Sequence, residues 1–122
     1  MRLLLDTHAL IWWDEGHLPR AATKAVQDAL EVWVSAASAW EIAIKSALGK
    51  IAVRGSVAEA VADYGFSALP ITIAHAEAVR TLPPGHKDPF DRLLIAQAQI
   101  EDLTILTHDP AFRAYAVAVS WI

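Results

Sequence analysis

The sequence predicts an α/β fold: a single domain, 1–122, with a mainly parallel central sheet flanked by helices on both faces. Three observations lead to this prediction. Short apolar runs typical of buried strands alternate along the chain with longer amphipathic stretches typical of helices. Hydrophobic residues make up 55% of the chain, which suits either a sheet covered on both faces or an exposed apolar patch that meets a partner. The length of 122 residues fits one domain with a substantial core.

The first part of the chain alternates strand and helix signals. Arg2–Leu5 is a short apolar run that ends at an acid, and it predicts a buried strand. A helical stretch follows through Trp13. Residues 20–30 are rich in alanine and have apolar residues at helical spacing, which predicts an amphipathic helix. Val32–Val34 predicts the second strand.

The next helix has both a start and a stop signal. A serine, Ser35 or Ser38, caps its beginning, and the helix runs to Leu48 and ends at Gly49. The other elements expected before residue 82 are helices at 56–64 and 74–81 and a strand at 68–71.

The Pro83-Pro84-Gly85 run breaks the chain before its last third. Asp88-Pro89 opens a helix to about Asp102, because proline suits the first helical position. The elements expected after it are a strand at 103–106, a short helix from Asp109-Pro110 and a closing strand at 117–121.

The composition excludes several kinds of protein. There is no cysteine, so disulfides and thiolate metal sites are excluded, and any metal must be held by oxygen or histidine nitrogen. The net charge of −4 argues against binding to nucleic acid through bulk charge alone. The apolar start is interrupted by Asp6 and His8, and no stretch approaches the roughly twenty apolar residues of a membrane helix. We expect a soluble, cytoplasmic protein without membrane contact.

Four acids from distant parts of the chain are expected at one edge of the sheet. Asp6 follows the first strand, and Asp109 lies three residues after the strand at 103–106, so both belong at the carboxyl edge where ligands bind. Glu41 lies early in a helix, and Asp91 lies in the first turn of another. Such a cluster repels itself unless cations neutralise it or some acids hold protons. Oxygen ligands without thiolates favour Mg²⁺ or Mn²⁺.

Each acid also has a simpler interpretation. Asp109 could be only the N-cap of the helix begun by Pro110, and Asp6 could cap the helix that follows it. Glu41 could complete a capping box with Ser38, or pair with Lys45 one turn later.

Asp88 and Asp91 compete for one role. Asp88 precedes Pro89 and is the natural cap, whereas Asp91 shares a helical face with apolar Leu94 and Ile95. An acid on a core-facing edge needs a partner, and a metal would supply one. We therefore assign Asp91 to the site and Asp88 to capping.

Four segments of the chain resemble the acidic motifs of the PIN-domain ribonucleases and, more narrowly, of the VapC toxins of toxin–antitoxin pairs. The similarity spans nearly the whole chain in the family's order. The segments are Leu3-Leu4-Leu5-Asp6-Thr7-His8, Ser35 to Lys45, Asp88 to Ala98, and Leu106-Thr107-His108-Asp109.

The resemblance implies a PIN-like domain that is a metal-dependent endoribonuclease and leaves 5′-phosphate and 3′-hydroxyl ends. By this resemblance, the acids that hold Mg²⁺ or Mn²⁺ in the family correspond to Asp6, Glu41, Asp91 and Asp109. Thr107 corresponds to a hydroxyl position near the metal. It also implies an RNA substrate and a cognate VapB-like antitoxin. We further expect a symmetric homodimer.

Some polar residues near the acids have more than one interpretation. Asp88 could share the site with Asp91, and Lys45 and Arg92 could contact substrate phosphates or be solvated surface charges. His8, His86 and His108 each lie within two residues of an acid, without the paired helical spacing of a zinc hydrolase. We interpret them as loop histidines near a polar site.

Two other functions remain open at this stage. One is a catalytically silent PIN-like interaction module, and the other is a phosphatase with Asp6 as nucleophile, although His8 stands where such enzymes have a second Asp. For the antitoxin, we expect a groove between the first helices, anchored near Trp12 or Trp13, of which one is core and the other exposed. The other tryptophans, Trp33, Trp40 and Trp121, are expected in the core.

Overall fold

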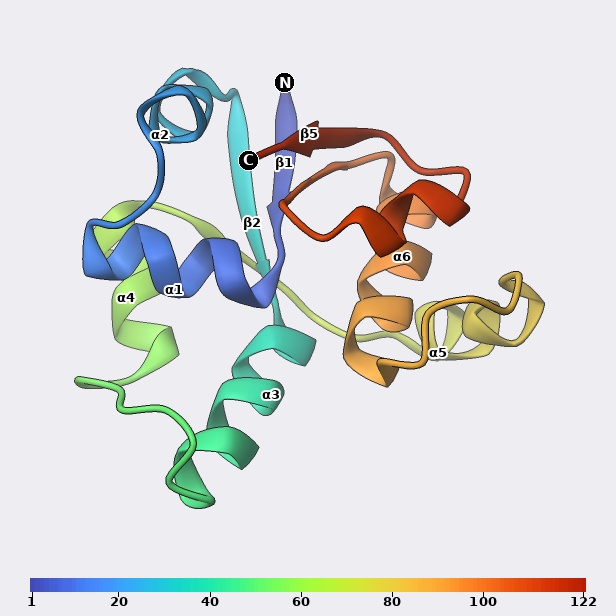
Figure 1. The fold of residues 1–122 in the computed structure, drawn as a ribbon, viewed down its shortest axis with the longest axis horizontal. Helices are drawn as coiled ribbons and strands as arrows, with labels where there is room; N and C mark the ends of the chain where they lie inside the picture. Colours follow the sequence, from blue (N-terminus) through green and yellow to red (C-terminus); the bar gives the residue numbers. More distant parts are fainter.

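Five parallel strands form one sheet in the order β3-β2-β1-β4-β5 (Figure 1). The structure, a computed structural model, describes all residues 1–122. The predicted α/β class with a parallel sheet is confirmed, and all four strand pairs are parallel. The strands are β1 (Arg2–Leu5), β2 (Glu31–Ser35), β3 (Ser67–Leu69), β4 (Thr104–Thr107) and β5 (Val119–Trp121).

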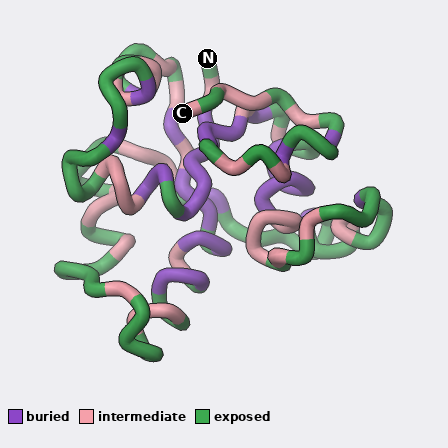
Figure 2. Tube along the Cα trace, viewed as in Figure 1, coloured by how far each residue is buried: buried purple, intermediate pink, exposed green.

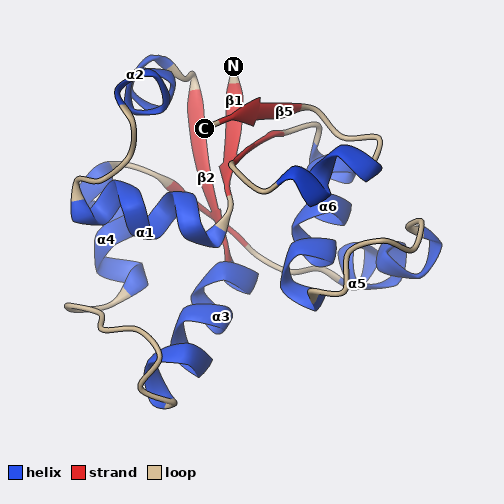
Figure 3. Cartoon of the chain, in the orientation of Figure 1, coloured by secondary structure: helices blue, strands red, loops and turns tan.

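Helices connect the strands and lie on both sides of the sheet (Figure 3). The α-helices are α1 (Thr7–Glu15), α2 (Arg20–Asp28), α3 (Ala36–Ala47), α4 (Val57–Tyr64), α5 (Ile73–Ala78) and α6 (Pro89–Glu101), with 3-10 helices η1 (Val79–Thr81) and η2 (Pro110–Ala114). None of these helices combines the length and the hydropathy needed to cross a lipid bilayer.

The side chains of β1 alternate between two cores. Leu3 and Leu5 pack with buried residues of α1 and α2, whereas Leu4 packs with α6 and with Phe112 of η2. The alternation follows from the period of two along a strand. Buried residues therefore concentrate in the central strands and along α6 (Figure 2), and the expected covering of both faces is confirmed.

Most element boundaries fall within two residues of the predicted ones. Ser35, not Ser38, caps α3, because the Ser35 hydroxyl accepts from the Ala37 amide at 2.9 Å. α2 ends at Asp28, since Ala29 is extended and Leu30 points into solvent.

The prediction for the tryptophans was partly wrong. Trp40 is 57% exposed on α3, where its ring packs against Phe90 of α6, and Trp121 is 41% exposed on the edge strand β5. Trp33 is half-buried against the core on the α6 side of the sheet. Trp12 and Trp13 are both half-buried, instead of one buried and one exposed.

Candidate metal centre

Asp6 lies where the carboxyl ends of β1 and β4 meet. Its backbone amide donates to the Leu106 carbonyl at 3.2 Å, which continues the pairing of the two strands. Its side chain is 2% exposed: Oδ1 accepts from the Ala9 amide at 2.7 Å, and Oδ2 accepts from the Thr107 hydroxyl at 2.5 Å. Burial raises the pKa of the Asp6 carboxyl, and these two hydrogen bonds oppose that rise. Asp6 thus caps α1, as the simpler interpretation suggested, and still belongs to the acidic edge.

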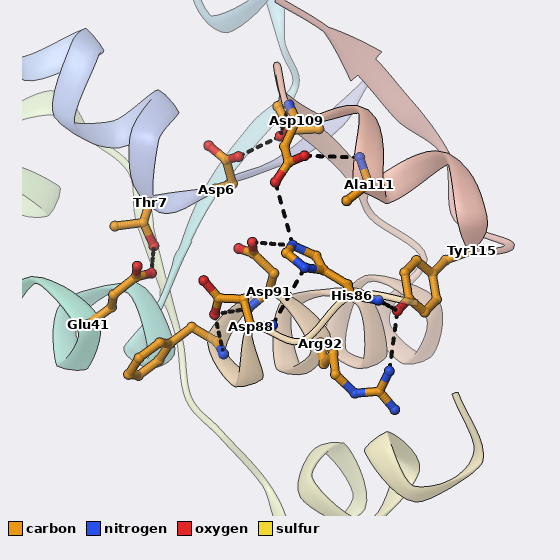
Figure 4. Close-up of polar contacts among 12 residues, drawn as sticks. Asp6, Thr7, Glu41, His86, Asp88, Asp91, Arg92, Asp109, Ala111 and Tyr115 are labelled. Atoms are coloured by element: carbon orange, nitrogen blue, oxygen red, sulfur yellow. Dashed lines mark hydrogen bonds and ion pairs between the residues drawn. The ribbon is translucent and has the colours of Figure 1, made fainter. Parts of the chain in front are cut away.

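Asp109 likewise caps a helix and lies at this edge of the sheet. Its Oδ1 accepts from the Ala111 amide at 2.9 Å at the start of η2, and its own amide donates to Thr107 Oγ1 at 3.0 Å. The buried Thr107 hydroxyl therefore connects Asp6 and Asp109, and Oδ2 of Asp109 remains turned toward Asp91 and His86 (Figure 4).

Asp88 caps α6 as predicted, and Asp91 lies among the other acids. Asp88 caps α6, because its Oδ1 accepts from the amides of Phe90 at 2.8 Å and Asp91 at 3.2 Å. Asp91 is half-buried beside the other acids. Burial and the charges of Asp88 and Asp6 together raise the pKa of the Asp91 carboxyl to about 7, and the contact with His86 opposes that rise. Burial and the neighbouring negative charges therefore disfavour the ionised form of Asp91.

Glu41 lies on the α3 side of the site, 2% exposed, and both of its oxygens have partners. Oε1 accepts from the Thr7 hydroxyl at 2.6 Å, and Oε2 pairs with Lys45 Nζ at 2.5 Å. The predicted pairing with Lys45 is present, whereas a capping box with Ser38 is not, since Ser35 is the cap. The hydrogen bond to Glu41 raises the pKa of Lys45, and the charges of Asp88 and Asp91 raise it further. The negative charges of Glu41, Asp88 and Asp91 therefore all act on the Lys45 ammonium group.

Arg92 makes structural contacts, and its possible contact with substrate stays a prediction. Its guanidinium donates to the carbonyls of Pro83 at 2.9 Å and Val79 at 3.2 Å, and to the Tyr115 hydroxyl at 3.2 Å. These bonds hold the segment between η1 and α6 against α6.

His86 is closer to the acids than the sequence analysis indicated. Its Nε2 lies 2.7 Å from Asp91 Oδ2 and 3.5 Å from Asp109 Oδ2 (Figure 4). One ligand atom from each of these three residues lies within 4.8 Å of the others. The only signal in the sequence is its position two residues before the Asp88 cap, which brings the ring back over the first turn of α6.

The residues fit a small divalent cation. The donors are carboxylate oxygens and one imidazole nitrogen, the set that Mg²⁺, Mn²⁺ and related ions accept. Burial, together with the charges of Asp88 and Asp6, raises the pKa of Asp91, and a bound cation would stabilise its ionised form.

The comparisons with known proteins agree with the fold. The PIN-domain family model matches residues 3–118. No curated protein matches the chain by sequence. The chain is similar in structure to a toxin–antitoxin complex from Klebsiella pneumoniae, with TM-score 0.69, 20% identity, and 97% of this chain and 96% of that one covered. It is also similar to FitAcB from Neisseria gonorrhoeae, with TM-score 0.65, 25% identity, and 96% and 95% covered.

A further similar structure is VapBC2 from Rickettsia felis bound to a DNA fragment from their promoter, with TM-score 0.72 and 12% identity, covering 100% of this chain and 99% of that one. The resemblance drawn from four short acidic segments is thus confirmed over almost the whole length, and the chain belongs to the PIN-domain family.

Proposed function

We propose that this chain is a metal-dependent endoribonuclease and the toxin of a toxin–antitoxin pair. The observation that carries the proposal is the meeting of Asp6, Asp91 and Asp109 at the carboxyl edge of β1 and β4 in a PIN-domain chain. Asp6, Asp91 and Asp109 would hold Mg²⁺ or Mn²⁺, with Glu41 at the α3 side of the site. When bound, such an ion neutralises charge on the scissile phosphate and lowers the pKa of an attacking water.

The chain's own residues prepare this site before a ligand arrives. Thr107 and the Ala9 amide fix the orientation of the Asp6 carboxyl, and the Asp88 cap fixes the first turn of α6, which carries Asp91. Lys45 is partly exposed and is the better candidate for a phosphate contact, since Arg92 is engaged with backbone carbonyls. A contact with phosphate would compete with the ion pair between Lys45 and Glu41.

The two other functions are less well supported. In a phosphatase, Asp6 would have to attack phosphorus, yet His8 stands where such enzymes place a second Asp. A silent interaction module would keep the fold without needing a half-buried Asp91 whose pKa is raised to about 7 by its surroundings.

The test is cleavage of a structured RNA by the purified chain with Mg²⁺, with Mn²⁺ and with EDTA. We expect cleavage with either ion, none with EDTA, and products with 5′-phosphate and 3′-hydroxyl ends. Cleavage that continues in EDTA would contradict metal dependence, and no cleavage of any RNA in either ion would favour the silent module.

The antitoxin part of the proposal is supported by a groove between α1, α3 and α4. It measures about 940 Å³ and is lined mostly by apolar residues, among them Leu10, Ile11, Ile42 and Ala43. Trp12 and Trp13 do not line this groove, so their expected role in anchoring the antitoxin stays a prediction. An apolar antitoxin segment lying here would run along α3, the helix that also carries Glu41, and a basic side chain of that segment could compete with metal or RNA at the acidic edge.

A further inference from the structure

His86 is held in place by contacts that do not involve the acids. Its amide donates to the hydroxyl of the buried Tyr115 at 2.8 Å, and Arg92 donates to the same hydroxyl. The imidazole ring packs edge-on against Phe112, with ring centroids 5.9 Å apart. The ring is only 15% exposed. Residues of α6 and η2 therefore bring His86 to the two acids that the same elements carry.

The position of Nε2 suits a shared ligand better than a surface ion pair. It lies 2.7 Å from Asp91 Oδ2 and 3.5 Å from Asp109 Oδ2. Neighbouring ligands of a six-coordinate ion with bonds of about 2.0–2.2 Å lie about 3 Å apart. The two distances from Nε2 are thus close to the spacing that one shared ion would require, and the three residues each offer a ligand atom within 4.8 Å of the others.

The second ring nitrogen does not prevent this role. Nδ1 lies 3.5 Å from the Asp88 amide, at the outer limit of a hydrogen bond, so this contact does not decide which nitrogen carries the proton. Nε2 can therefore present its lone pair to a cation while Nδ1 carries the hydrogen.

We propose that His86 is a nitrogen ligand of the metal centre, bound through Nε2 beside Asp91 and Asp109. Imidazole suits transition ions such as Zn²⁺ and Fe²⁺, whereas Mg²⁺ and Mn²⁺ prefer oxygen ligands. A nitrogen ligand from His86 therefore makes the site more favourable to transition ions than carboxylates alone would, and Mn²⁺ serves as the spectroscopic probe. The inference rests on the proposed metal site but adds a residue that lies outside the four acidic positions.

The test uses Mn²⁺ as a spectroscopic probe of the purified chain in a buffer without nitrogen ligands. Electron spin-echo measurements on bound Mn²⁺ should show coupling to a ¹⁴N nucleus, and labelling the histidines with ¹⁵N should replace that coupling. His86→Ala should remove it and weaken Mn²⁺ binding at least about tenfold, with a smaller effect on Mg²⁺. The matched control is His108→Ala, because His108 is next to Asp109 in sequence but its ring packs on Trp12, at 4.6 Å between centroids.

The possible results separate this inference from the proposed function. Mn²⁺ that binds without histidine nitrogen coupling, or with coupling that persists in His86→Ala, overturns the role of His86 and leaves the carboxylate site standing. A chain that binds no Mn²⁺ overturns both. The labelling experiment needs no variant, so it shows whether a histidine binds the ion even if His86→Ala fails to fold, and coupling that is kept in His108→Ala then excludes that neighbouring histidine.

Discussion

Thr107 donates its hydroxyl hydrogen to Asp6 Oδ2 over 2.5 Å, although the two residues are 101 positions apart in the chain. The contact exists because β1 and β4 are neighbours, so Leu5 pairs with Leu106 and the residues after them meet. Since Oδ1 of Asp6 accepts from the Ala9 amide, both oxygens are oriented before any ligand binds. Such support of a ligand by neighbouring groups is what a precise site requires.

Thr107→Val should destabilise the fold, and Thr107→Ser should not. Valine keeps the shape but leaves the buried Asp6 oxygen and the Asp109 amide without a partner, at a cost of about 1–3 kcal/mol. Urea unfolding of both variants measures the difference. Equal stability of the two would mean that the hydroxyl contributes little to holding Asp6.

Asp6→Asn and Asp91→Asn should each lower RNA cleavage at least about a hundredfold while the fold is kept, because both lose a charged ligand that no neighbour replaces. Asn can still accept from the Ala9 amide and cap α1. Circular dichroism checks the fold, and cleavage in Mn²⁺ checks the activity. Full activity in either variant would contradict the assignment of that residue to the site.

Asp88 offers a control three residues before Asp91. Asp88→Asn should keep most of the activity, since Asn caps a helix as well as Asp, whereas Asp88→Ala should cost about 1 kcal/mol of stability. Cleavage rates and urea midpoints of the two variants test this. If Asp88→Asn is as inactive as Asp91→Asn, the two acids share the metal.

The stability of the metal-free chain should fall as pH rises from about 4 to about 7. The folded state keeps a proton on Asp91 up to about pH 7, whereas a free Asp releases it near 3.8. Over this range the folded state binds more protons than the unfolded state, so the free energy of unfolding decreases with pH. Asp91→Asn removes this contribution, so its stability relative to wild type should increase from pH 5 to pH 8, measured in urea with EDTA. A difference that stays constant with pH would show that Asp91 titrates normally.

The fold could be predicted from the sequence because its signals are local. Arg2–Leu5 and the other strands are short apolar runs, and caps such as Asp88 and stops such as Gly49 mark the helices. The acids could be placed at one edge because they follow predicted strands or open predicted helices. The contacts of Arg92 and His86 could not be predicted from the sequence, since both residues bond to Tyr115, which lies 23 and 29 positions away along the chain. The exposure of Trp40 depends in the same way on which face of α3 meets the sheet.

The groove between α1, α3 and α4 leads to the last prediction, on the antitoxin. Ala43 is exposed on α3 and lines the groove, so Ala43→Arg places a long charged side chain where an apolar segment would lie. We expect this variant to keep its fold and its RNA cleavage, because residue 43 contacts none of the four acids through a hydrogen bond. It should bind the protein encoded beside it at least about tenfold more weakly, since unpaired charge buried at an interface costs several kcal/mol.

The matched control is Ala62→Arg, which adds the same side chain to an exposed position of α4 that does not line the groove. The wild-type chain and the two variants are each co-expressed with the neighbouring reading frame and co-purified. Each is then titrated with the purified partner. The groove is the antitoxin site if only Ala43→Arg loses the partner and its cleavage of RNA is no longer inhibited. Equal binding by both variants would place the antitoxin on another surface, and a partner that binds none of the three chains would contradict the toxin proposal while leaving the nuclease proposal intact.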